Sequence, residues 1–129
     1  AEGGAAAVSV LTEPSRFDGH LDHLRQAAAA LRPLGVPAMR KDFLVDPYQV
    51  LEARAHGAGG VLIIIGMLSR AQLDELCAAA REQVLASGQS VLQSENGFIY
   101  EVFPDGRRMV VKKIERPTRF VSGKIFTIR

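Results

Sequence analysis

A threefold alternation of apolar runs with helical segments, spread over residues 5–88, most constrains the fold of this chain. The apolar runs cover residues 5–12, 36–40 and 61–65. Unbroken series of aliphatic side chains are typical of strands buried on both faces, as in parallel sheets covered by helices. The connections are short, so we expect right-handed crossovers and parallel strands. Residues 1–88 are therefore predicted to form a βαβαβα segment of the α/β class.

Apolar spacings of three and four predict a helix after each strand. Asp18 is the candidate N-cap of the first helix, and Asp46 with Pro47 predicts the start of the second. Ser69 and Gln72 form a capping box for the third. The apolar stripe of this third helix consists of Leu73, Leu76, Cys77, Ala80 and Val84. We expect the stripe to lie in a core, with Cys77 as a small buried group.

The pattern changes after Gly88, where a domain boundary is predicted. Residues 98–103 and 107–114 read as an antiparallel hairpin around the turn Pro104-Asp105-Gly106, and residues 120–129 read as a third strand. Residues 89–129 are thus predicted to be a β-meander that packs on the first segment or is exchanged with another copy.

Charge also differs between the two parts. Residues 1–88 carry eight Lys and Arg against ten Asp and Glu, whereas residues 89–129 carry eight against four. A small basic nucleic-acid-binding module is therefore one alternative. Its cations would be Arg107, Arg108, Lys112, Lys113 and Arg119, with Phe98, Tyr100 or Phe103 as stacking platforms. A solvated basic face is the simpler interpretation, so nucleic acid is an unlikely partner.

Several classes of site and location are disfavoured. Cys77 is the only cysteine, which excludes an intramolecular disulfide and a multi-thiolate metal site. His20 and His23 stand three residues apart without a convincing third ligand, so we predict no metal and no cofactor.

The longest apolar run, residues 59–68, falls well short of the roughly 20 residues of a membrane-spanning helix. With no charged-then-apolar leader at the start, a cytoplasmic protein without a membrane partner is expected.

Three stretches in fixed order carry a resemblance to a known family. They read EGGAAAVSVLTE at residues 2–13, VPAMRKDF at residues 36–43 and DPYQVLEAR at residues 46–54. Together they resemble indole-3-glycerol phosphate synthase, over residues 1 to about 83. By this resemblance they correspond to the second, third and fourth strand-helix units of a TIM-type barrel. The remainder of the chain resembles no family that we identify.

The resemblance implies a lyase of tryptophan biosynthesis that closes the ring of a phosphoribosyl substrate with loss of carbon dioxide and water. Lys41 matches the general acid of the family, Phe43 a ring that packs on the substrate, and Glu13 a position at the barrel mouth. From the residues alone, the favoured interpretation is that Lys41 is merely a charged residue that leaves a strand toward solvent and pairs with Asp42 or Asp46. Catalytic residues of such barrels lie at the carboxyl ends of strands, which is where these residues fall.

The family also uses a glutamate and a lysine of its first strand, a glutamate of its fifth strand and a phosphate pocket from its last loops. None is located in this sequence, and only Glu95 could stand in for an acid. Lys41 is then a vestigial general acid. The leading hypothesis is a recombined or engineered folding unit without catalytic activity, which the abrupt start Ala1-Glu2-Gly3-Gly4 favours. The alternative is a lyase that needs the other barrel portions.

Three parallel strands cannot close a barrel, so the sheet is predicted to have two open edges. Open edges tend to pair with other strands. We therefore expect self-association as a homodimer or a larger assembly.

Overall fold

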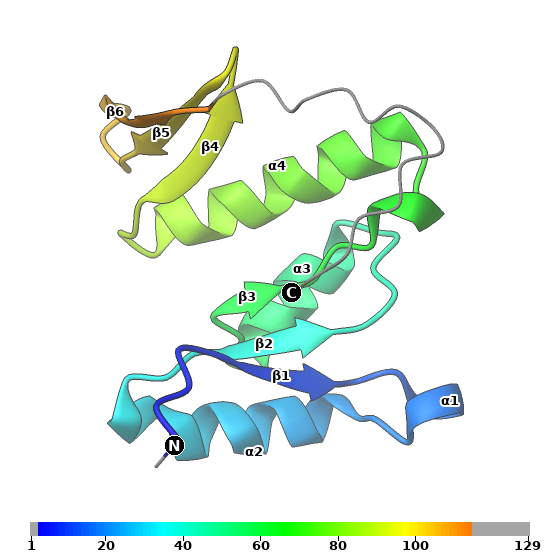
Figure 1. Ribbon diagram of the computed structural model, residues 1–129. Helices are drawn as coiled ribbons and strands as arrows, with labels where there is room; N and C mark the ends of the chain where they lie inside the picture. The colour runs from blue at the N-terminus through cyan, green and yellow to red at the C-terminus, as the bar shows by residue number, and fades with distance from the viewer. Residues whose placement is uncertain (1–2, 115–129) are drawn as a thin grey trace, which may run out of the picture. The chain divides into compact units, whose positions relative to one another are not determined.

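The computed structural model of the protein describes residues 3–114 and divides the chain into two units, Ala1–Ser87 and Gly88–Arg129 (Figure 1). The first unit holds a three-stranded parallel sheet with helices, and the second a three-stranded antiparallel sheet. The prediction of an α/β fold with an antiparallel β-meander is confirmed at this level.

The parallel sheet has the order β1-β2-β3, with β1 at Val8–Leu11, β2 at Ala38–Lys41 and β3 at Gly60–Val61. Leu11 is the register partner of Lys41, and Arg40 is the partner of Val61. The predicted strand over residues 61–65 is wrong in extent. Ile65–Met67 form instead the 3₁₀ helix η2, and the Ile65 side chain is 66% exposed. Within the described part of the chain, β3 pairs with β2 alone, and no second neighbouring strand adds to its hydrogen-bonded ladder.

Two helices follow β1: α1 at Pro14–Phe17 and α2 at Leu21–Leu31. The prediction that Asp18 caps the second of these is wrong, because Asp18 ends α1 in the left-handed conformation. His20 is the N-cap of α2, and its Nδ1 accepts the Asp22 amide at 3.0 Å. The intervening Gly19 is buried, and a Cβ there would lie 2.7 Å from the Leu11 carbonyl oxygen. A glycine therefore lets the chain turn tightly from α1 into α2.

The 3₁₀ helix η1 at Arg32–Leu34 extends α2, and α3 at Tyr48–Ala55 follows β2. The Tyr48 amide donates to Asp46 Oδ1 at 2.8 Å, so Asp46 holds the first turn of α3 from just before its N-cap Pro47.

The last helix of the first unit is α4 at Arg70–Ala86, and the predicted capping box between Ser69 and Gln72 is confirmed. Leu76 is fully buried, but Cys77 is exposed, which corrects the expectation of a buried thiol. The helix contacts its neighbours through Leu76, Ala79 and Ala80. Consecutive helical residues differ by about 100° in direction, so the choice of this face turns Cys77 to the outside.

Two apolar clusters form the core of the first unit. The first consists of Leu24, Ala28, Ala38, Ala53 and Ala58, with Val10, Leu21, Leu31 and Val61 packed against it. The second consists of Leu44, Val50 and Leu76. Because side chains alternate along a strand, Val10 and Ala38 lie on the helix-covered face and leave Leu11 and Lys41 on the other.

In the second unit, β4 at Val91–Glu95, β5 at Phe98–Val102 and β6 at Arg108–Lys113 form an antiparallel meander. The predicted hairpin around Pro104-Asp105-Gly106 is confirmed as β5 and β6. A strand preceding the hairpin, β4, joins β5 through Asn96 and Gly97, both at positive φ. The strand predicted over residues 120–129 lies outside the described residues.

No helix between residues 3 and 114 is both long and apolar enough to span a membrane.

Candidate functional site

The candidate site lies where β1 and β2 end. The Thr12 amide donates to the Lys41 carbonyl oxygen at 3.3 Å, which extends the pairing of the two strands by one step. Glu13 follows at the end of β1, and Asp42 and Phe43 follow at the end of β2. Carboxyl ends of neighbouring parallel strands meet at one edge of a sheet, so this pairing brings Glu13, Lys41 and Phe43 to the same edge.

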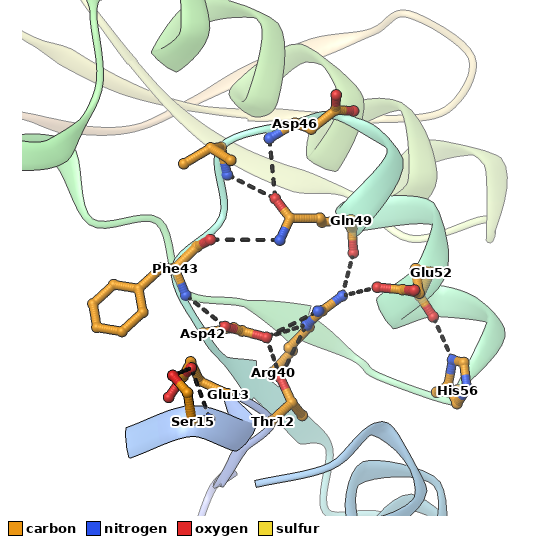
Figure 2. Close-up of polar contacts among 11 residues, drawn as sticks. Thr12, Glu13, Ser15, Arg40, Asp42, Phe43, Asp46, Gln49, Glu52 and His56 are labelled. Carbon is orange, nitrogen blue, oxygen red and sulfur yellow. Dashed lines mark hydrogen bonds and ion pairs between the residues drawn. The ribbon is translucent and has the colours of Figure 1, made fainter. Parts of the chain in front are cut away.

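A buried arginine organises this edge (Figure 2). Arg40 Nη2 lies 2.9 Å from Asp42 Oδ2, and Arg40 Nη1 lies 2.8 Å from Glu52 Oε2. Its Nη1 also donates to the Gln49 carbonyl oxygen, and its Nε donates to Thr12 Oγ1 at 3.1 Å. Only 5% of the Arg40 side chain is exposed. This single guanidinium therefore ties the ends of both strands to α3.

Asp42 is the second centre of the network. Its Oδ2 accepts the Thr12 hydroxyl at 2.6 Å, and its Oδ1 accepts the Phe43 amide at 2.8 Å. Burial raises the pKa of Asp42, but the hydrogen bonds from Thr12, Arg40 and the Phe43 amide outweigh burial and hold the pKa below its usual range. Asp42 is thus kept as a carboxylate that joins the Thr12 side chain, at the end of β1, to the Phe43 backbone, after β2.

Gln49 holds the loop between Phe43 and α3. Its Oε1 accepts the Val45 amide at 2.7 Å and the Asp46 amide at 3.1 Å, and its Nε2 donates to the Phe43 carbonyl oxygen at 3.4 Å (Figure 2). Each of these bonds satisfies a loop backbone group that no strand partner satisfies. The position of the Phe43 backbone is therefore fixed on both sides, by Asp42 and by Gln49.

Lys41 is exposed and lies on the sheet face opposite Arg40. Among residues 3–114, Lys41 takes part in no ion pair. The two carboxylates considered as ion-pair partners of Lys41 bind other groups. Asp42 pairs with Arg40, and Asp46 accepts the Tyr48 amide. The Lys41 side chain is therefore exposed and forms no ion pair with the described carboxylates that follow it in sequence.

An aromatic pair includes Phe43, two residues after Lys41. The rings of Phe17 in α1 and Phe43 are 6.4 Å apart between centroids and tilted by 37°. Phe17 is half-exposed, so apolar surface remains open at this edge. The sequence analysis missed Phe17, since only contact with Phe43 connects it to the site.

Glu13 is engaged locally. Its carboxylate accepts the Ser15 and Arg16 amides at 3.0 and 2.8 Å and caps α1. The hydrogen bond from the Ser15 hydroxyl, followed by that from the Arg16 amide, lowers the pKa of Glu13 below its usual range. Glu13 is therefore an ionised cap at this edge, and its predicted contact with substrate stays a prediction.

Two of the five basic residues predicted for nucleic-acid binding are paired with carboxylates of the second unit. Arg107 contacts Asp105 and lies 5.3 Å from the centre of the Phe103 ring. Arg108 contacts Glu95 and lies 4.3 Å from the centre of the Tyr100 ring. Both rings thus already have a guanidinium over one face, which leaves less aromatic surface for bases to stack on. Arg119 lies outside the described residues.

His20, which the sequence analysis considered as a metal ligand together with His23, is the N-cap of α2. Its ring and that of His23 are 6.1 Å apart between centroids. Within residues 3–114 no group of three or more His, Cys, Asp or Glu side chains is placed to hold a metal ion.

Comparison with known proteins gives one consistent result. The family model for indole-3-glycerol phosphate synthase matches residues 1–91. The indole-3-glycerol phosphate synthase of Salinibacter ruber is 48% identical over 96 residues, which are 74% of this chain and 35% of the relative. The enzyme of the same name from Rhizorhabdus wittichii is 54% identical over 79 residues, 61% of this chain and 29% of the relative. The chain spans about a third of the length of the curated relatives it matches. Through residues 1–91, the chain belongs to the indole-3-glycerol phosphate synthase family.

Proposed function

We propose that residues 1–91 supply the second to fourth strand-helix units of a TIM-type barrel that forms indole-3-glycerol phosphate in tryptophan biosynthesis. The observation that carries this proposal is the convergence of Lys41, Phe43 and Glu13 at the carboxyl ends of two paired strands. This is the edge at which barrel enzymes hold their catalytic groups.

Lys41 is proposed as the general acid. An ammonium group at a strand end, free of ion pairs with other described residues, can donate a proton to a departing hydroxyl. Phe43 would pack on the aryl end of the substrate, with the tilted ring of Phe17 beside it. Arg40 and Asp42 would act as positioning residues, since Asp42 accepts the Phe43 amide and Arg40 holds the Asp42 carboxylate.

In the family, the reaction also uses acids, a lysine and a phosphate pocket from units other than the three assigned to residues 1–91. Catalytic groups that act together lose about 10² to 10⁴ in rate when one is absent. We therefore propose that residues 1–91 by themselves form a folding unit without measurable lyase activity, and that activity requires the other strand-helix units of the barrel.

The test is complementation with the full chain. The remaining units of the Salinibacter ruber relative would be added as a separate polypeptide, and formation of indole-3-glycerol phosphate would be followed by its absorbance. We expect activity only in the mixture. Lys41→Ala should lower that activity by about 10² to 10⁴, whereas the control Lys112→Ala on β6 should leave it unchanged. Equal activity of the Lys41→Ala and unmodified mixtures would refute the role of Lys41.

A further inference from the structure

A basic groove lies on the first unit, away from the candidate site. It occupies about 590 Å³ between α2 and the end of α3. Its charged and polar lining is Arg25, Arg32, Arg54 and His56, and its other lining residues are alanines and Gly57. We call these four side chains and the hollow between them the basic groove.

The segments that line the basic groove lie before the amino ends of the parallel strands, whereas Lys41 lies at the carboxyl end of β2. Arg32 begins η1, which precedes β2, and His56 and Gly57 precede β3. These segments lead into the amino ends of the strands, whereas Lys41 and Phe43 lie at the carboxyl ends. The residues of the proposed lyase site are therefore not those of the groove.

The positive charge in the groove is largely uncompensated. Arg25 contacts Asp22, and the nearby Glu52 carboxylate is occupied by Arg40 at 2.8 Å. Of the residues that the structure describes, none forms an ion pair with Arg32 or Arg54. Like charges gathered around one hollow repel each other unless an anion lies between them.

Helix capping does not account for these arginines. The carbonyl oxygens at the end of α3 accept backbone amides: Ala53 accepts Ala58 at 3.0 Å, and Arg54 accepts Gly57 at 3.0 Å. The end of α2 is closed in the same way, since Leu31 accepts the Val36 amide at 3.3 Å. These carbonyl oxygens, which often accept hydrogen bonds from basic side chains at helix ends, therefore bind backbone amides and not the Arg32 and Arg54 guanidinium groups.

Gly57 and His56 shape the floor of the groove. Gly57 has φ +85°, and a Cβ there would lie 3.0 Å from Ala28 Cβ and 4.0 Å from Arg32 Nη2. The close approach of the two helix ends therefore brings Arg32 next to the α3 terminus. His56 Nδ1 lies 2.8 Å from the Glu52 carbonyl oxygen, which can only accept, so Nδ1 carries a proton and holds the imidazole ring against the end of α3.

We propose that the basic groove binds a small anion with two or more phosphate groups, such as pyrophosphate or a nucleoside diphosphate. Guanidinium groups bind phosphate oxygens in a bidentate manner, and several of them match a ligand with several phosphate charges. The volume lies in the range of small-molecule sites, about 300 to 1,000 Å³. This binding is independent of the proposed lyase activity.

The experiment is calorimetric titration of the full chain with inorganic pyrophosphate. We expect saturable binding of one pyrophosphate per chain, weakened at least about tenfold in the double variant Arg32→Gln/Arg54→Gln. The matched control is Arg70→Gln/Arg81→Gln, which removes two exposed arginines from α4 and should change affinity less than about twofold. Equal weakening in both double variants, or no saturation, would overturn the proposal and leave a non-specific cationic surface.

A second measurement does not depend on any variant. Titration of the isotopically labelled, unmodified chain with pyrophosphate should shift the backbone amide resonances of Arg32, Arg54, His56 and Gly57 along saturating curves. Shifts confined to other parts of the chain would locate the anion elsewhere and overturn the assignment. Unchanged circular dichroism of the double variant would show that its lost affinity reflects the groove and not unfolding.

Discussion

At the scale of single residues, Arg40 and Asp42 couple the fold to the candidate site. Their side chains are 5% and 10% exposed, and their charges are paired at 2.9 Å. A buried ion pair gains little over an apolar replacement, but removal of one partner leaves an uncompensated buried charge. Here Glu52 also contacts Arg40, and Thr12 also contacts Asp42. Loss of either central residue is therefore expected to loosen both strand ends.

Asp42→Asn is expected to lower the free energy of unfolding by about 2 to 3 kcal/mol, because a neutral amide cannot replace the charge-assisted bonds to Arg40 and Thr12. Urea denaturation followed by circular dichroism at neutral pH measures the change. The control Asp74→Asn breaks an exposed contact with Arg70 on α4 and should cost less than about 0.5 kcal/mol. Equal losses in the two variants would contradict a special role for the buried network.

The pKa of Asp42 also predicts how stability changes with pH. Because folding lowers this pKa below its ordinary value of 3.8, the unfolded chain binds the proton more readily than the folded chain. The contribution of Asp42 is therefore complete above pH 3.8 and is lost as the pH falls through the lower folded-state pKa. Denaturation midpoints measured down this range should fall less steeply in Asp42→Asn than in the unmodified chain. Parallel curves would contradict the assignment.

At the scale of elements, α4 depends strongly on its N-terminal cap. It has the longest run of helix described, but only Leu76 along it is buried. Its stability therefore rests more on local interactions than that of α2, which buries both Leu24 and Ala28. The capping box satisfies backbone donors that the first helical turn leaves without partners.

Ser69→Ala is expected to destabilise the first unit by about 1 kcal/mol, since it removes the acceptor for the Gln72 amide. Thermal unfolding followed at 222 nm would report the loss. Ser69→Thr keeps the hydroxyl and should recover most of the stability. If Ser69→Thr were as destabilising as Ser69→Ala, the hydroxyl would not be the stabilising group.

At the scale of the whole molecule, each unit has edge strands that pair on one side only with strands of residues 3–114. β1 and β3 flank the parallel sheet of the first unit, and β4 and β6 flank the antiparallel sheet of the second. On β6, the side chains of Met109, Val110 and Val111 are all more than half exposed. Apolar edge strands favour pairing with another chain.

We therefore expect self-association, with a solution mass of at least twice that of one chain, measured by size-exclusion chromatography with light scattering. Met109→Lys/Val111→Lys on β6 should shift the protein toward the monomer, because charge on an edge strand opposes pairing. A control with Leu34→Lys, an exposed residue of η1, should leave the mass unchanged. A monomeric unmodified chain at all concentrations would contradict the expectation, and the alternative of the meander packing on the first unit of its own chain would gain support.

The sequence by itself determined the features that depend on local chemistry. Apolar periodicity located α2, α3, α4 and the parallel strands β1 and β2. The spacing of Ser69 and Gln72 located a cap, and Pro104-Asp105-Gly106 located a turn, since these signals act within a few residues. The motifs around Lys41 identified the family for the same reason, because they are contiguous.

Only the tertiary structure decided which side chains meet across distant segments. The burial of Arg40 between Asp42 and Glu52, the approach of Phe17 to Phe43 and the outward position of Cys77 depend on how elements pack. The short extent of β3 depends on which neighbour it pairs with. A pattern along one element states which faces are apolar. Contact between elements depends on the relative placement of their backbones, which no local pattern contains.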